Sequence, residues 1–224
     1  MATAVSEPRD ALAEWRVFLP LPTKLTSAAL GDAFDGAYDE RKGDGMVGRR
    51  DVYLAVNPTI GLKRRGSKGR VELKVMTEGG IAEDGGIKGI EHWKKYKIGK
   101  GLAEEESLAH VHTLLESHGL IDSHVTSLLA SEDGTKSVEV AKLRVDKAYD
   151  TEGVHVEDCL VEAEGKDYRS FAVEGKPDDV KRFLATHPVG QKLYAQATAD
   201  VGAILHGYPG FVLLQSLVLD IQAF

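Results

Sequence analysis

Three hairpin signals in series constrain the fold of this chain more than any other feature of its sequence. The first joins 61–65 to 70–76 through the glycine-bounded turn 66–69. The other two are short polar turns with glycine, at 131–135 and 165–167, and each lies between two strand-like segments. Successive hairpins pair antiparallel strands, so the pattern predicts an antiparallel meander or barrel.

Strand-like and helix-like segments together complete this prediction. The expected strands span 15–21, 51–56, 61–65, 70–76, 125–130, 137–149, 154–164 and 168–173. The expected helices span 102–118, 177–186 and 189–205, and the expected loops include 39–50 and 77–89. The apolar end 211–224 is compatible with a strand or a buried helix. We therefore predict an α+β protein, an antiparallel β-barrel of about eight strands with flanking helices.

Length and composition suit one globular domain. The chain has 224 residues, of which 42% are hydrophobic and 28% charged, and no domain boundary is evident. We expect a single barrel domain over 1–224, with a flexible N-terminal stretch at 1–12. The lone cysteine, Cys159, cannot form an internal disulfide, which is typical of a reducing compartment.

The charge balance limits the classes of partner. The formal net charge is −7, which argues against nucleic acid and anionic membrane as partners. An anion site would therefore need a local concentration of positive charge. The N-terminus does not resemble a secretory signal, and the longest apolar tract, 211–219, is too short and too polar to span a bilayer. A cytoplasmic protein is expected.

Basic residues lie two apart on several of the expected strands, which places them on one face of each strand. Lys63 and Arg65 form one pair, Lys142 and Arg144 form another, and Lys74 lies on the strand next to the first pair. In a barrel such residues could line the interior and hold an anion. Solvent-facing strands produce the same pattern, because Lys and Arg are rarely buried, so orientation is left open.

A further basic segment, 91–100, contains Lys94, Lys95 and Lys97 with two aromatic residues between them. This arrangement could contact phosphate. Exposed lysines are common, so a solvated surface strand or turn is the favoured interpretation.

Several short motifs follow one another in an order that is informative as a whole. They are Asp51-Val52-Tyr53, Lys63-Arg64-Arg65, Glu72-Leu73-Lys74, a helix end at Gly119, Lys142-Leu143-Arg144 before Tyr149, and a late strand ending at Glu174. This order, over about residues 13–206, resembles the CYTH family, also called triphosphate tunnel metalloenzymes.

The resemblance implies an eight-stranded tunnel that holds a triphosphate through basic residues and Mg²⁺ or Mn²⁺ through acidic ones. The implied phosphate-binding residues are Lys63, Arg65, Lys74, Lys142 and Arg144, and the candidate metal ligands are Glu72, Glu162 and Glu174. Arginine can bind two phosphate oxygens at once, and hard divalent cations prefer carboxylate oxygens. The implied partner is a phosphorylated small molecule or polyphosphate.

The first strand departs from the family's Glu-x-Glu-x-Lys motif. In one register the motif positions are Ala13, Trp15 and Val17, and in the other they are Glu14, Arg16 and Phe18. Neither register keeps the motif, and the late Glu-x-Glu is reduced to Ala172 and Glu174. Two functions therefore remain open. One is a metal-dependent triphosphatase or other phosphohydrolase, and the other is a non-catalytic protein that binds a phosphorylated ligand or supports a complex.

Overall fold

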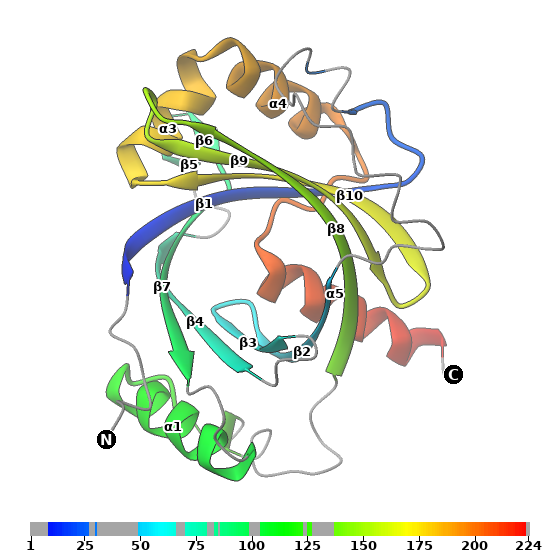
Figure 1. Ribbon diagram of the computed structural model, residues 1–224. Helices are drawn as coiled ribbons and strands as arrows, with labels where there is room; N and C mark the ends of the chain where they lie inside the picture. The colour runs from blue at the N-terminus through cyan, green and yellow to red at the C-terminus, as the bar shows by residue number, and fades with distance from the viewer. Residues whose placement is uncertain are drawn as a thin grey trace.

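The structure is a computed structural model that describes residues 9–26, 30, 49–65, 70–79, 83–84, 86–98, 104–122, 125–126 and 137–222. Within these residues, eight antiparallel strands form a closed barrel in the order β1-β10-β9-β8-β2-β3-β4-β7 (Figure 1). The barrel strands are β1 (Arg9–Pro20), β2 (Arg49–Asn57), β3 (Ile60–Arg65), β4 (Arg70–Gly79), β7 (Ile90–Ile98), β8 (Ser137–Tyr149), β9 (Val154–Ala163) and β10 (Lys166–Gly175). The predicted fold class is confirmed.

The remaining elements flank this barrel. They are the short strands β5 (Glu83–Asp84) and β6 (Ile87–Lys88), and the helices α1 (Glu104–Ser117), α3 (Pro177–Thr186), α4 (Pro188–Ala199) and α5 (Tyr208–Gln222). Among the described residues, no helix is both long and apolar enough to cross a membrane.

The barrel closes through a segment that the sequence predicted only as a solvated surface strand or turn. Residues 90–98 form β7, which pairs with β4 on one side and with β1 on the other. The predicted strand 125–130 is wrong where it is described, because residues 125–126 are helical, and the rest of it lies outside the described residues. Pairing on both sides makes 90–98 a central strand despite its many lysines, which local composition could not indicate.

Other boundaries differ in smaller ways. β1 begins at Arg9, inside the stretch expected to be a flexible N-terminus. The helix predicted over 189–205 ends at Ala199, because Ile204 instead forms a backbone bridge to Phe18. The apolar C-terminal end adopts a helix, α5, and β5 and β6 pair within the stretch expected to be a loop at 77–89. Of the predicted loop 39–50, residues 39–48 lie outside the described part.

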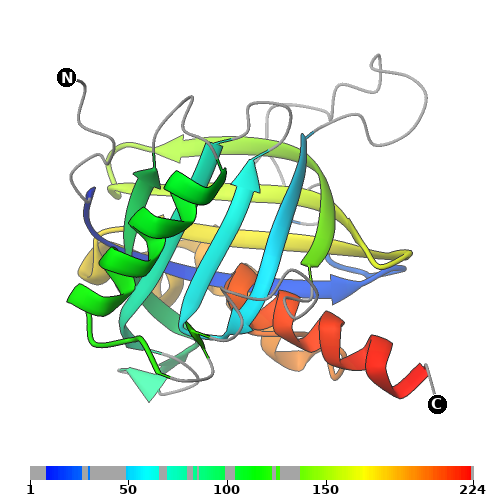
Figure 2. The ribbon, with the colours of Figure 1, turned by 90° about the horizontal axis from the view of Figure 1, so that it is seen from below.

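Two helical layers cover opposite outer faces of the barrel (Figures 1 and 2). α3 and α4 pack on β1, β9 and β10, where Trp15, Val173 and Phe183 are buried together. α1 lies across β4 and β7, where Leu73 and Val111 belong to a second buried cluster. Alternate residues of the same strands consequently face the barrel interior.

α5 packs into one end of the barrel interior. The Phe211 ring stacks on Phe18 with centroids 3.9 Å apart, and the Tyr208 ring stacks on Tyr53 at 5.3 Å. Both phenylalanines and both tyrosines belong to one buried apolar cluster. This end of the interior is therefore filled by side chains.

A buried carboxylate fixes the start of α5. Glu91 on β7 accepts a hydrogen bond from the backbone N–H of Gly207 at 2.9 Å and lies 3.3 Å from His206 Nδ1. A Cβ at position 207 would lie 2.5 Å from the Glu91 carboxylate, so any other residue there would have to displace this side chain.

The packing of α5 gives a stability prediction. Phe211→Ala removes a fully buried ring and leaves a cavity, so we expect the free energy of unfolding to fall by about 3–5 kcal/mol. Leu217→Ala on the same helix is the control. Leu217 is 50% exposed, and its truncation should change stability by no more than about 0.5 kcal/mol. Urea denaturation followed by circular dichroism measures both, and equal losses would show that Phe211 does not anchor the helix.

Candidate functional site

A cavity of about 500 Å³ lies inside the charged part of the barrel. Among the described residues, its basic lining consists of Arg16, Arg49, Lys63, Arg65, Lys74, Lys95, Lys97, Lys142 and Arg144, and its acidic lining consists of Glu72, Glu157 and Glu174. Lining residues differ in depth. The side chains of Arg16 and Lys142 are 2% and 5% exposed, whereas that of Arg144 is 43% exposed and lies nearer solvent.

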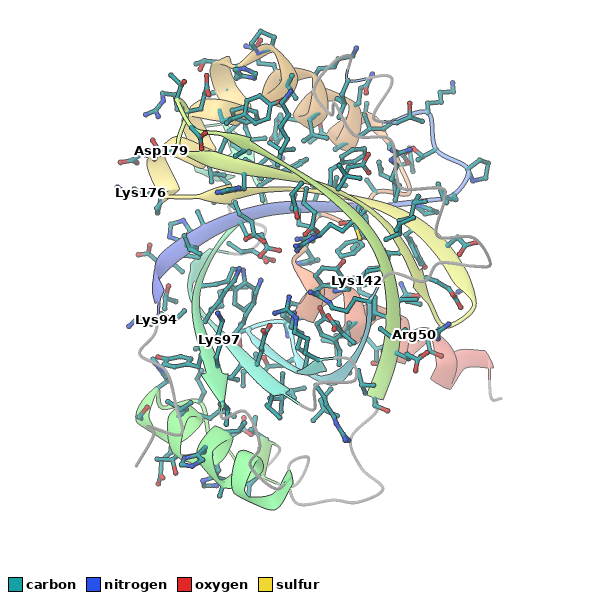
Figure 3. All side chains as sticks on the ribbon, in the orientation of Figure 1. Arg50, Lys94, Lys97, Lys142, Lys176 and Asp179 are labelled. Carbon is teal, nitrogen blue, oxygen red and sulfur yellow. The ribbon has the colours of Figure 1, made fainter. Side chains whose placement is uncertain are left out.

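The structure decides the orientation that the sequence left open. All five residues proposed to bind phosphate, namely Lys63, Arg65, Lys74, Lys142 and Arg144, line this one cavity. Figure 3 shows Lys142 and Lys97 on the inner side of the ring of strands, with Lys94 and Arg50 on its outer side. The basic pairs are therefore interior residues rather than part of a solvated face.

The predicted metal ligands do not come together. Glu72 and Glu174 line the cavity, but Glu162 does not. Cys159, Val161 and Ala163 on β9 belong to the interior apolar cluster, so the strand alternation directs Glu162 outward. Within the described part of the chain, no group of three or more His, Cys, Asp or Glu residues is placed to hold a metal ion.

The cavity carboxylates are also engaged by cations. Glu72 lies 3.2 Å from Lys63 Nζ and accepts a hydrogen bond from Arg65 at 2.8 Å. Glu174 accepts one from Lys95 at 3.2 Å. A divalent cation would have to displace these partners, so the set Glu72, Glu162 and Glu174 does not fit Mg²⁺ or Mn²⁺.

Sequence reasoning missed several basic lining residues. Lys95 and Lys97 were expected on a solvated segment, but β7 lies between β1 and β4 and carries both into the cavity. The period-two series formed by Trp93, Lys95 and Lys97 was the available signal. Arg49 was assigned to a loop, and nothing in its local sequence distinguished it.

β1 adopts the second of the two registers considered for its motif. Trp15 and Val17 pack outward under α3 and α4, whereas Glu14, Arg16 and Phe18 face inward. Arginine therefore occupies the middle motif position and phenylalanine the last. The strand is buried on both faces, so its apolar residues could not reveal which face points inward.

Arg16 is the centre of a buried charge network. Its Nε donates to Glu14 at 2.7 Å, and its Nη1 donates to Glu157 at 2.5 Å and to the Ser170 hydroxyl at 3.0 Å. Its Nη2 lies 3.6 Å from Glu174. Burial opposes the charged form, but Glu157 and Glu14 outweigh this effect and raise the pKa of Arg16 above its ordinary value.

The pKa values of the carboxylates in this network shift in the opposite direction, downward. Burial alone would raise the pKa of Glu157, but Arg16, with help from Arg144 and Lys142, lowers it to about 2. Glu14 behaves similarly: burial raises its pKa, and Lys74 and Arg16 together bring it well below the ordinary value. Both carboxylates are therefore ionised at neutral pH.

Lys142 lies among aromatic rings at the deep side of the cavity. Its Nζ donates to the Tyr53 hydroxyl at 2.6 Å and lies 3.2 Å from the centre of the Tyr208 ring. Asp51 lies 3.7 Å from the same nitrogen. Burial and the nearby Lys63 lower the pKa of Lys142 well below its ordinary value, against the opposing effect of Asp51.

Lys63 shows what burial does to a charged amine in this cavity. Burial lowers its pKa to about 8, Glu72 and Asp51 oppose the shift, and Lys74 adds to it. The cavity therefore contains amines whose pKa values are lowered, mainly by burial. A bound polyanion would supply the missing negative charge.

Comparisons with known proteins give distant similarities. Neither a protein-family model nor a curated protein matches the chain. A protein from Hippeastrum, named as an adenylyl cyclase and described with a dominant triphosphatase activity, superposes with a TM-score of 0.43 at 16% identity, covering 92% of this chain and 95% of that one. A protein from Bacillus halodurans, named as an adenylate cyclase, gives 0.38 at 11% identity, covering 83% and 90%.

The Lys63 environment gives a prediction about its titration. In protein labelled with ¹³C-lysine, one Cε signal should titrate with a midpoint of about 8, because the desolvated Lys63 ammonium is the less stable form above that pH. Lys63→Arg should remove this signal and leave the other lysine signals in place. A midpoint near 10.5 for Lys63 would contradict the buried, cation-rich environment described here.

Proposed function

We propose that the protein binds a triphosphate or polyphosphate-type anion inside its barrel. The observation that carries this proposal is the cavity lining, in which, among the described residues, nine basic side chains from six strands face three carboxylates. The volume of about 500 Å³ lies in the range of ordinary small-molecule sites. A ligand with several negative charges fits this lining better than a neutral or singly charged one.

The basic residues have complementary roles in this proposal. Near solvent, Arg65 and Arg144 present planar forks that can each bind two phosphate oxygens. Deeper in the barrel, Lys63, Lys74 and Lys142 supply point charges, which act strongly because water is largely excluded there. A linear chain of phosphates would contact several strands at once.

The ion pairs favour binding over metal-dependent hydrolysis. Phosphoryl transfer assisted by Mg²⁺ or Mn²⁺ requires carboxylate oxygens that are free to bind the ion. The carboxylates that line this cavity each contact a basic side chain, and they are not grouped as a metal site within the described residues. A phospholigand-binding protein is therefore the form of the proposal that the geometry supports best.

Two adjacent arginines on β3 test the binding proposal. Arg65 lines the cavity, whereas Arg64 is exposed on the outer face. Isothermal titration with tripolyphosphate should show that Arg65→Gln weakens binding by about 10- to 100-fold, the usual cost of a lost charge-assisted contact. Arg64→Gln removes one positive charge, as Arg65→Gln does, but should change affinity less than about twofold. Equal losses would indicate nonspecific attraction rather than a cavity site.

A turnover assay separates binding from hydrolysis. Incubation with tripolyphosphate or nucleoside triphosphates, with and without Mn²⁺, should release no more phosphate than the protein-free control, because the cavity carboxylates are already paired. Metal-dependent release that disappears in Arg65→Gln would instead assign a hydrolase to the same cavity. Absence of both binding and turnover would refute the proposed function.

A further inference from the structure

Three carboxylates from three different strands surround a single guanidinium in the barrel. They belong to Glu14 on β1, Glu157 on β9 and Glu174 on β10, and Arg16 lies 2.7, 2.5 and 3.6 Å from them, respectively. The guanidinium carbon of Arg16 also lies 4.6 Å from the centre of the Tyr208 ring. Arg16 is 2% exposed, so this is a buried and well-held cation.

Each of the three carboxylates has a second basic partner. Glu14 accepts a hydrogen bond from Lys74 at 2.5 Å, and Glu157 accepts one from Arg144 at 3.1 Å. Glu174 contacts Lys95 at 3.2 Å. These second partners line the cavity, so the Arg16 cluster also fixes three of the basic side chains that would meet an anion.

A guanidinium in this place does the electrostatic work that a bound metal ion could otherwise do. It neutralises buried carboxylates, which is a strong requirement where water is excluded. It also uses the lone pairs that a divalent cation would need, since Mg²⁺ and Mn²⁺ bind several oxygen ligands at once. Because the guanidinium is part of β1, it cannot be exchanged for an ion from solution.

We infer that Arg16 is the resident cation of this cavity, held by Glu14, Glu157 and Glu174, and that it makes the site selective for the metal-free form of a polyphosphate. A magnesium complex carries less negative charge and has oxygens already occupied by the ion, so it matches the basic lining less well. Divalent cations then oppose binding by sequestering the ligand. This inference about ligand form rests on the proposed function, whereas the role of Arg16 does not.

The role of Arg16 can be tested without any anion. Mn²⁺ is titrated into the protein alone, and free Mn²⁺ is measured by electron paramagnetic resonance. We expect the wild type to bind no Mn²⁺ in the submillimolar range at this site. Without the guanidinium between them, Glu14, Glu157 and Glu174 can close on one ion, so Arg16→Met should gain one bound Mn²⁺. That ion has to compete with Lys74, Arg144 and Lys95 for the same carboxylates. Arg16→Met combined with Glu157→Gln should lose that ion again.

Arg144→Met is the matched control. It removes one basic partner of Glu157 but leaves Arg16 in place, so it should not gain Mn²⁺. Circular dichroism must show each variant to be folded. The inference about Arg16 is overturned if the wild type binds Mn²⁺ and Glu157→Gln abolishes it, or if folded Arg16→Met gains none.

Selectivity for the metal-free ligand can be tested with the wild type alone, even if Arg16→Met does not fold. Tripolyphosphate is titrated calorimetrically in EDTA and again in excess Mg²⁺. The apparent affinity should fall by at least about tenfold in Mg²⁺. A rise in affinity with Mg²⁺ would overturn the inference. Failure of tripolyphosphate to bind in either buffer would refute the proposed function, and the Mn²⁺ titration would still decide the role of Arg16.

Discussion

Compensation of buried charge in the barrel interior is the constraint on which this structure depends. A closed antiparallel barrel directs alternate side chains inward, where an unpaired charge is far more costly than in water. Arg16 meets this constraint for Glu14 and Glu157 at once, and its pKa and theirs shift in opposite directions as a result. The remaining cation excess then lies on the cavity wall, where Lys63 and Lys142 have lowered pKa values.

Along a single strand, the side chains that face the barrel interior change from apolar to charged over two residues. On β1, Phe18 packs with α5, and Arg16, two residues away on the same face, joins the charge network. On β9 the same change occurs between Cys159 and Glu157. Tyr208 at the start of α5 touches both sides, because it stacks on Tyr53 and lies under Lys142. α5 therefore fills one end of the barrel and also forms part of the cavity floor.

The sequence predicted this architecture unevenly. Hairpin turns gave β3–β4 and β9–β10 with nearly correct boundaries, because turn chemistry and strand alternation are local properties. The place of β7 in the barrel was not predicted. Its lysines indicate a solvated strand or turn until β1 and β4 are placed on either side of it. Glu162 fails as a cavity residue for a related reason. Its position on a strand was predicted correctly, but its side chain lies on the outer face of β9.

The amino-acid sequence by itself determined the antiparallel barrel class and the basic pairs that share a face. Lys63 with Arg65 and Lys142 with Arg144 follow from a period of two, which any strand imposes. Only the tertiary structure decided that these faces point inward, that Arg16 meets carboxylates from β9 and β10, and that Lys95 and Lys97 belong to the same cavity. The physical reason is that barrel closure and helix packing select which face of each strand is enclosed, and residues far apart in sequence become partners only then.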